Sequence, residues 1–187
     1  MVSETVAEVP KPALLKLDLG CGKNKREGFL GVDSLDFETV DCVTDLRNSW
    51  PWDNESADEA HCSHFIEHLT APERIHFVNE LYRVLIPGGK AAIITPHWAS
   101  NRAYGDLTHQ WPPVCEMWFF YLNKAWREKE APHTCALYTC DFDFTAGYSM
   151  RQDLMVRNQE FQQFALANYK EAALDIIATI TKPLKPR

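Results

Sequence analysis

The chain has 187 residues and a formal net charge of −7, with 45% hydrophobic and 24% charged residues. This length and composition are typical of one globular domain with its own core. The acidic balance argues against general binding to nucleic acid, because neutralising phosphates requires a basic surface. No run approaches the roughly 18 apolar residues that a membrane span needs.

Cysteine usage points to a reducing compartment. The six cysteines show no CxxC spacing and no secretory leader precedes them, so we expect free thiols and a cytoplasmic location. They are Cys21, Cys42, Cys62, Cys115, Cys135 and Cys140.

The first ordered element is predicted at residues 15–19, after a polar stretch, 1–12, that we expect to be a flexible arm. Leucines alternate along 15–19, as in a strand. Gly20 and Gly22 follow and permit a tight turn that a ligand can approach, because glycine has no Cβ. Alone, this pattern is as often a turn that binds nothing as a cofactor loop.

Two further apolar runs end in carboxylates. Residues 29–32 lead into Asp33, and residues 40–44 lead into Asp45 and Leu46. A carboxylate at the end of the second strand suits the two hydroxyls of a ribose, which can both donate to it. A carboxylate followed by a backbone N–H suits the edge of an adenine. The three strand ends together predict a nucleoside site.

The next segment carries Trp50 and Trp52, which we interpret as sealing the core in preference to lying against an adenine. A fourth strand is predicted at 57–62. Its carboxyl end should face the ligand crevice, with the backbone near Cys62 and the side chain of His64 directed there.

A metal cluster is the alternative interpretation of this strand exit. We expect no metal, because a strand-to-loop run rarely directs so many neighbouring side chains to one point. The residues concerned are His61, Cys62, His64 and His68.

A helix and a fifth strand come next. Thr70 and Glu73 have the capping-box spacing, so a helix should begin there and continue at helical spacing to Leu85. Pro87-Gly88-Gly89 should stop this helix, and residues 90–95 supply the strand.

Residues 97–133 form a long polar and aromatic segment that we interpret as an active-site cover, with a helix from Pro112 to about Trp126. If a substrate bound under this cover loses a proton in the reaction, a basic side chain must take that proton. We predict His109, oriented by Asp106, since imidazole titrates near working pH. Loop residues that only form tethering hydrogen bonds are the alternative for each of these positions. The substrate contacts expected here are Asn101, Arg102 and Tyr104.

The end of the chain should complete the sheet. Alternating apolar residues predict a strand over 137–144, helical spacing predicts a helix over 158–169, and residues 174–181 predict a last strand. Residues 182–187 are interpreted as a solvated tail.

The ordered motifs resemble those of class I S-adenosylmethionine-dependent methyltransferases, especially the small type 11-like group, over about residues 14–98. The resemblance implies a single α/β domain with a Rossmann-like, mostly parallel, seven-stranded sheet. Two departures stand out: the loop lacks a third glycine, and few residues remain for helices after the first strands. The motifs are Asp18-Leu19-Gly20-Cys21-Gly22, Asp33, Asp45-Leu46 and Leu85-Ile86-Pro87-Gly88-Gly89.

By this resemblance the cofactor is S-adenosylmethionine. Gly20 and Gly22 would pass beneath its methionyl part, Asp33 would hold the ribose, and Asp45 would face the adenine amine. Asp18 would brace the loop or meet the amino group. The remaining expected cofactor contacts are Cys21, Leu46, Cys62 and His64.

The function indicated is methyl transfer to an unidentified acceptor, for which the acidic charge and aromatic cover favour a small molecule. Two alternatives stay open. One is a catalytically silent cofactor-binding protein with a regulatory or structural role. The other is a dinucleotide oxidoreductase, which the incomplete GxGxxG and Asp45 disfavour.

Overall fold

The computed structural model describes residues 14–185, so the expected arm at 1–12 lies outside the described residues. Seven strands form one sheet in the order β3-β2-β1-β4-β5-β7-β6. Strand β7 runs opposite to the other six strands of this sheet, so it pairs antiparallel with both β5 and β6. The predicted α/β fold class is confirmed. The strands are β1 (Leu15–Leu19), β2 (Leu30–Asp33), β3 (Cys42–Val43), β4 (Ala57–Ser63), β5 (Leu85–Pro96), β6 (Asp143–Met150) and β7 (Ala173–Thr181).

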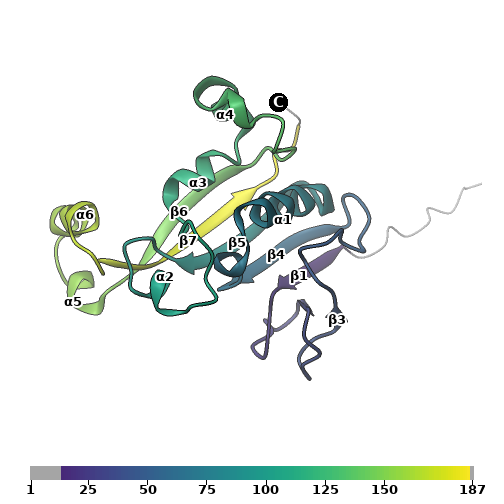
Figure 1. Cartoon of the computed structure of the whole chain (residues 1–187), viewed down its shortest axis with the longest axis horizontal. Helices are drawn as coiled ribbons and strands as arrows, with labels where there is room; N and C mark the ends of the chain where they lie inside the picture. The colour runs from purple at the N-terminus through teal and green to yellow at the C-terminus, as the bar shows by residue number, and fades with distance from the viewer. Residues whose placement is uncertain (1–13, 186–187) are drawn as a thin grey trace, which may run out of the picture.

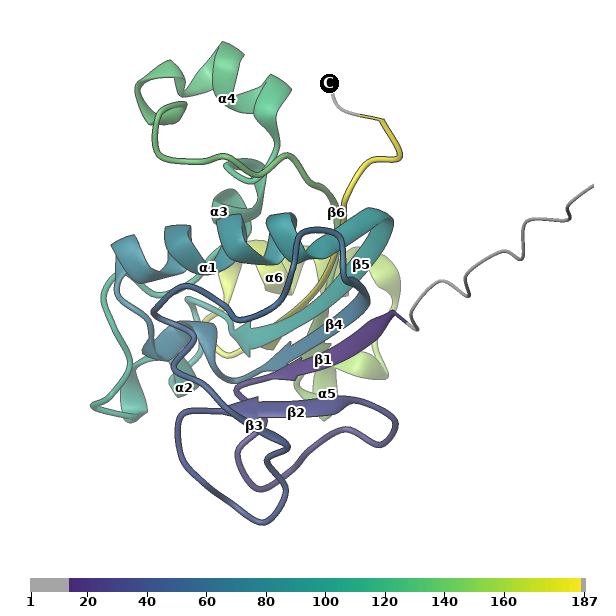
Figure 2. The same cartoon turned by 90° about the vertical axis from the view of Figure 1, so that its right-hand side faces the viewer.

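The helices are unevenly distributed. Helix α1 runs along one face of the sheet, whereas α5 and α6 lie beyond one end of β6 and β7 (Figure 1). Residues 20–56 contain no helix, as the short connections after the first strands predict, and Figure 2 shows them as open loops around β2 and β3. The helices are η1 (Ile66–His68), α1 (Ala71–Val84), α2 (Arg102–Gly105), α3 (Glu116–Phe120), α4 (Lys124–Glu130), η2 (Pro132–Thr134), α5 (Gln152–Met155) and α6 (Gln159–Asn168).

Helix α1 begins where the capping box predicts. The Thr70 N–H donates to Glu73 Oε2 at 2.7 Å, and the helix buries Phe77 and Leu81 against the sheet. The helix ends at Val84, so Leu85 and Ile86 separate it from the Pro-Gly-Gly turn that we expected to stop it. That turn instead forms a bulge inside β5, where the pairing with β4 jumps from Leu85 to Lys90.

The core confirms the interpretation of the first tryptophan. Trp50 is buried, its Nε1–H donates to the Leu46 carbonyl at 3.1 Å, and its ring meets Phe77 edge to face at 5.3 Å. Trp52 packs edge to face against Trp50. Both indoles therefore belong to the packing between α1 and the loop after β3.

Two predicted elements differ in the structure. The helix expected from Pro112 to Trp126 is two short helices, because Asn123 interrupts it and caps α4 by accepting from the Trp126 N–H at 3.0 Å. The predicted helix at 158–169 and last strand at 174–181 are confirmed as α6 and β7, within a residue at each end.

The strand expected at 137–144 starts only at Asp143. Three of its alternating apolar residues, Tyr138, Cys140 and Phe142, are buried, but side chains replace the partner strand. Arg127 Nη2–H donates to the Cys140 carbonyl at 2.7 Å, and Asn79 Oδ1 accepts from the Thr139 N–H at 2.9 Å. These bonds satisfy the backbone that a strand neighbour would otherwise pair.

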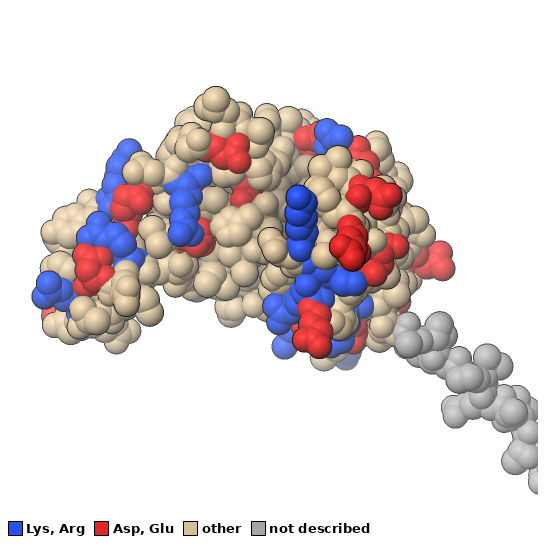
Figure 3. All heavy atoms as spheres, turned by 90° about the horizontal axis from the view of Figure 1, so that it is seen from below, with Lys and Arg blue, Asp and Glu red and all other residues tan. Residues whose placement is uncertain are grey.

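One face of the molecule is mixed in charge. On the face seen in Figure 3, lysines and arginines are interspersed with acidic side chains. Within residues 14–185, no helix has the length and apolar character needed to cross a membrane.

Candidate cofactor and acceptor site

The glycine loop after β1 turns sharply toward β2. Gly20 and Gly22 have φ angles of +72° and +50°, which glycine adopts without strain. The Gly20 and Cys21 N–H groups both donate to the Val32 carbonyl, at 2.8 and 3.1 Å. A Cβ on Gly20 would overlap the ring of Phe65, whereas a Cβ on Gly22 would meet nothing within 4 Å. The space beside Gly20 is therefore filled by Phe65, whereas the space beside Gly22 is free for a ligand.

Asp18 braces this loop, which is one of its two expected roles. It is buried, and its Oδ2 accepts from the Arg26 N–H at 2.6 Å. Its Oδ1 lies 2.7 Å from His61 Nδ1. Cys21 also contributes to the loop as a neutral thiol, because burial, followed by the Asp18 and Asp33 carboxylates, raises its pKa to about 11.

Asp33 ends β2 beside the open side of the loop. Its Oδ2 accepts from the Gly22 N–H at 3.0 Å, and its Oδ1 accepts from the Leu35 N–H at 3.0 Å. Each carboxylate oxygen still has a lone pair for a further donor. The carboxylate thus joins β2 to the glycine loop at the place predicted for the ribose.

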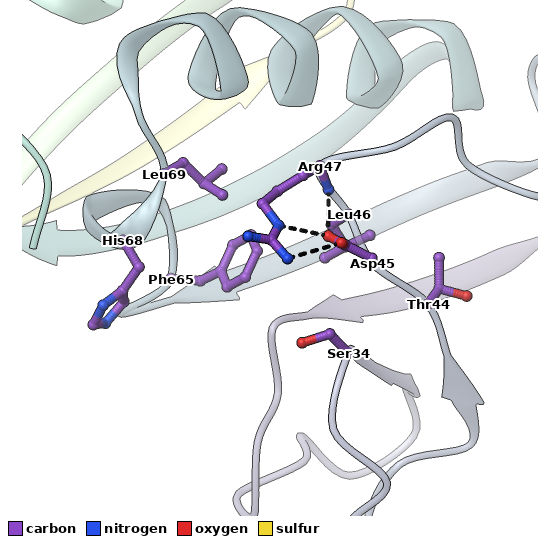
Figure 4. Close-up of a pocket in the computed structure, with 8 residues that line it drawn as sticks. All are labelled: Ser34, Thr44, Asp45, Leu46, Arg47, Phe65, His68 and Leu69. Atoms are coloured by element: carbon purple, nitrogen blue, oxygen red, sulfur yellow. Dashed lines mark hydrogen bonds and ion pairs between the residues drawn. The ribbon is translucent and has the colours of Figure 1, made fainter. Parts of the chain in front are cut away.

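A cavity of about 200 Å³ opens between the ends of β2 and β3 and the segment after β4 (Figure 4). Typical ligand pockets measure roughly 300–1,000 Å³, so this space suits only the nucleoside end of the cofactor. The lining residues include both predicted positions after β3. They are Ser34, Thr44, Asp45, Leu46, Arg47, Phe65, His68 and Leu69.

Asp45 shares this cavity with a cation that sequence reasoning missed. Arg47 Nε–H and Nη2–H both donate to its carboxylate at 2.9 Å, as Figure 4 shows. These hydrogen bonds lower the pKa of Asp45 below its usual value. The carboxylate is therefore held ionised and oriented, which suits an acceptor for an exocyclic amine.

The exit of β4 combines a buried thiol with an oriented histidine. Burial raises the pKa of Cys62 well above its usual value, so its side chain is a neutral core group and only its backbone remains for the cofactor. His64 follows with a φ of +53°, an unusual conformation for a non-glycine residue. Its Nδ1 lies 3.2 Å from Glu67 Oε1.

Glu67 is a second residue, after Arg47, that sequence reasoning missed at this site. It is only 4% exposed, and its Oε2 accepts from the Thr95 hydroxyl at 3.2 Å. Its hydrogen bond to His64 raises the pKa of that imidazole above the usual 6.5. The three-residue spacing from His64 was the available signal, because η1 turns Glu67 back toward the strand.

Asp106 and His109, the expected catalytic pair, lie at the limit of contact in the cover segment. Asp106 Oδ1 accepts from the Thr108 N–H and hydroxyl, at 2.8 and 2.7 Å, whereas Asp106 Oδ2 lies 4.0 Å from His109 Nε2. Asp106 therefore caps its own turn and makes only a long ionic contact with His109, so the catalytic roles of the two residues stay a prediction. The ring of His109 also packs against His68, with centroids 4.7 Å apart.

Of the expected substrate contacts, Arg102 is engaged through its side chain and Asn101 through its backbone. Arg102 Nη1–H donates to both oxygens of Asp175, at 3.1 and 2.8 Å, so its charge is already paired. The Asn101 N–H donates to the Glu171 carboxylate. Tyr104 remains half exposed at an apolar surface cleft of about 490 Å³. Its other lining residues are Trp98, Trp111, Pro113, Cys115, Glu116, Met117 and Phe120.

Two buried side chains hold the cover segment in place. Arg74 of α1 donates from Nη1 to the Pro112 carbonyl at 2.5 Å and from Nη2 to the Gln110 carbonyl at 3.0 Å. His97 Nε2 lies 2.8 Å from Glu116 Oε1 at the start of α3. The first half of the cover segment is thus attached both to α1 and to the end of β5.

Comparison with known proteins bears on this arrangement. Residues 17–93 match the family described as "Methyltransferase domain". A SAM-dependent methyltransferase from Archaeoglobus fulgidus is similar with a TM-score of 0.62 and 19% identity, over 92% of this chain and 87% of that chain. The comparison with curated proteins gave no match.

Two further solved structures share the fold. A SAM-dependent methyltransferase from Methanosarcina mazei gives a TM-score of 0.53 at 14% identity, over 91% of this chain and 92% of that chain. One from Mesorhizobium loti gives 0.51 at 16% identity, over 90% of each chain. At these identities the likeness shows the fold.

Proposed function

We propose that this chain, whose residues 17–93 match the methyltransferase-domain family, is an S-adenosylmethionine-dependent methyltransferase that passes a methyl group to a small-molecule acceptor held beside residues 97–133. The observation that carries the proposal is that Asp33 bonds to the glycine loop at the end of β2, while Asp45 lines the cavity that begins at the next residue, Ser34, so that all three features lie at the carboxyl ends of the first strands. In an open α/β sheet this edge is where ligands bind.

The cofactor supplies a methyl group on a sulfonium when it is bound. Gly22 offers an approach with no side chain in the way, and Asp33 stands beside it for the ribose hydroxyls. Asp45 and the wall formed by Leu46 serve the adenine. Binding at this edge leaves the carboxyl ends of β4 and β5 for the acceptor.

We assign proton removal from the acceptor to His64 in place of His109. His64 has the hydrogen-bonded carboxylate partner that His109 lacks, and its side chain is about half exposed (46%) at the exit of β4. A buried carboxylate that holds Nδ1–H leaves Nε2 as the proton acceptor.

A small acceptor agrees with the rest of the molecule. The apolar cleft around Tyr104 can shield an organic group from water, and the mixed surface charge gives no reason to invoke nucleic acid. The six free cysteines agree with a reducing, cytoplasmic setting.

Calorimetric titration with S-adenosylmethionine and with S-adenosylhomocysteine tests the cofactor site. We expect one-to-one binding of both and, for Asp33→Ala, at least about tenfold weaker binding, because hydrogen bonds to a charged group contribute about 1.5–3 kcal/mol. Asp36→Ala, an exposed aspartate in the same loop, is the matched control. Equal affinity for Asp33→Ala and the parent, with both folded by circular dichroism, would show that the ribose position is wrong.

Turnover is tested separately with a panel of amine, hydroxyl and thiol acceptors and methyl-labelled cofactor. Labelled product from one acceptor class would support the enzyme and identify that class. Cofactor binding without label transfer to any acceptor would favour the silent-binder alternative.

A further inference from the structure

Three potential metal ligands meet where η1 contacts the cover segment. Glu67, His68 and His109 each offer one ligand atom, and these atoms all lie within 4.8 Å of one another. Of the four residues weighed from the sequence for a metal, only His68 belongs to this group. His61 is bonded to Asp18, and the Cys62 thiol is buried in the core.

The hydrogen bonds around His68 fix its tautomer. Thr108 has a single hydroxyl proton, and it donates this proton to Asp106 Oδ1 at 2.7 Å, because a carboxylate only accepts. The Thr108 oxygen must then accept from His68 Nδ1–H, 2.9 Å away. The lone pair of His68 is therefore on Nε2.

The same reasoning applies to His109. Its Nδ1 lies 3.3 Å from the Ala103 carbonyl oxygen, which has no proton to give, so Nδ1–H is the donor. The lone pair of His109 is on Nε2 as well. Histidines that bind metals through one nitrogen usually donate the other N–H to a carbonyl, carboxylate or similar group, and both of these histidines do so.

Glu67 completes the set as a fixed carboxylate. It is buried, and His64 and the Thr95 hydroxyl hold its two oxygens. A carboxylate oxygen that accepts one hydrogen bond keeps a second lone pair for a cation. A buried carboxylate beside two imidazole nitrogens with free lone pairs is favourable when all three groups bind one cation.

We propose that Glu67, His68 and His109 form a divalent transition-metal site of the zinc type, which ties the cover segment to η1 at the rim of the nucleoside cavity. Two imidazoles and one carboxylate favour Zn²⁺ over Mg²⁺ or Ca²⁺, which prefer oxygen ligands. Three protein ligands leave a fourth position open, as in catalytic zinc sites. His68 also lines the nucleoside cavity, so the cation lies between the cofactor and the cover segment.

The test measures metal directly and needs neither cofactor nor acceptor. Protein stripped with a chelator is equilibrated with Zn²⁺, dialysed and analysed for metal content, and Co²⁺ is added in parallel to record visible absorption. We expect one equivalent of zinc per chain, a Co²⁺ spectrum of a site with nitrogen and oxygen ligands, and a higher melting temperature with zinc than without.

Variants locate the site. His68→Gln and His109→Gln should each bind zinc at least tenfold more weakly and lose the zinc-dependent rise in melting temperature. His133→Gln, which alters an exposed histidine outside the cluster, should behave as the parent. Circular dichroism of the metal-free proteins checks that the variants are folded. A parent protein that retains no more zinc than the His68→Gln/His109→Gln double variant would overturn the proposal.

Discussion

Gly20 and Gly22 share a left-handed conformation but differ in what surrounds them. Alanine substitutions at the two positions should therefore affect stability and cofactor binding to different degrees. A methyl group at Gly20 would collide with the Phe65 ring, which packs against the core residue Phe77. We expect Gly20→Ala to destabilise the protein by about 2–4 kcal/mol through backbone strain and overpacking. Urea unfolding of the variant and the parent measures this loss.

Gly22→Ala is the matched change, because nothing lies within 4 Å of the added methyl group. It should cost only the backbone strain of about 1–2 kcal/mol and should weaken cofactor binding more than Gly20→Ala does. Equal losses of stability in the two variants would contradict the assignment of Phe65 as the group that closes the loop.

Single residues also show how far sequence reasoning extends. Asp33 and Asp45 could be placed because each follows or ends a short apolar run, and strand ends meet at one edge of a parallel sheet; Asp18 lies inside β1, one residue before its end. Glu67 could not be identified in the same way. Its spacing from His64 is a local signal only once the turn of η1 is known, and its bond to the Thr95 hydroxyl, 28 residues away, does not follow from local spacing.

At the scale of elements, α3 packs Phe119 and Phe120 against Phe144 of β6 and adds one polar anchor, the Glu116 carboxylate. Burial alone would raise the pKa of Glu116, but hydrogen bonds from His97, from its own backbone N–H and from Tyr148 outweigh this effect and lower the pKa to about 2. A lowered carboxyl pKa stabilises the fold above the unfolded value of about 4.3. The stabilisation is lost as the pH falls from there toward 2.

Glu116→Gln should therefore lower the melting temperature relative to the parent at pH 7, and this difference should shrink steadily between pH 4.5 and pH 2. Thermal unfolding across this range gives the measurement. Asp153→Asn, an exposed carboxylate paired with Arg151 on the surface, is a control with little expected effect. A difference between Glu116→Gln and the parent that is the same at pH 2.5 and pH 7 would refute the anchoring role.

Elements also show why part of the fold escaped sequence-based prediction. The alternation of Tyr138, Cys140 and Phe142 correctly indicates which side chains are buried. Period-two burial does not say what pairs with the backbone, and here the partners are the side chains of Arg127 and Asn79, distant in sequence. By contrast, the start of α1 was predictable because its capping box is entirely local.

At the scale of the whole molecule, the proposed cofactor site lies in the part of the sheet that has no helices between its strands. Residues 20–56 contain no helix, and β3 pairs with β2 through only two residues. Regions with little buried apolar contact open at lower free energy than the core. The half of the sheet that carries Gly22, Asp33 and Asp45 should therefore be the less stable half in the free protein.

Hydrogen exchange measured by mass spectrometry tests this asymmetry. In the free protein, amides of β2 and β3 should exchange faster than those of β4, β5 and β7. Cofactor at 100 times its dissociation constant stabilises the bound state by about 2.7 kcal/mol, so exchange at β2 and β3 should slow by up to about 100-fold. Asp33→Ala with the same cofactor concentration should show a smaller slowing, since binding is weaker. Slow exchange of β2 and β3 without cofactor would mean that the loops between the first strands stabilise this edge without a helix and without a ligand.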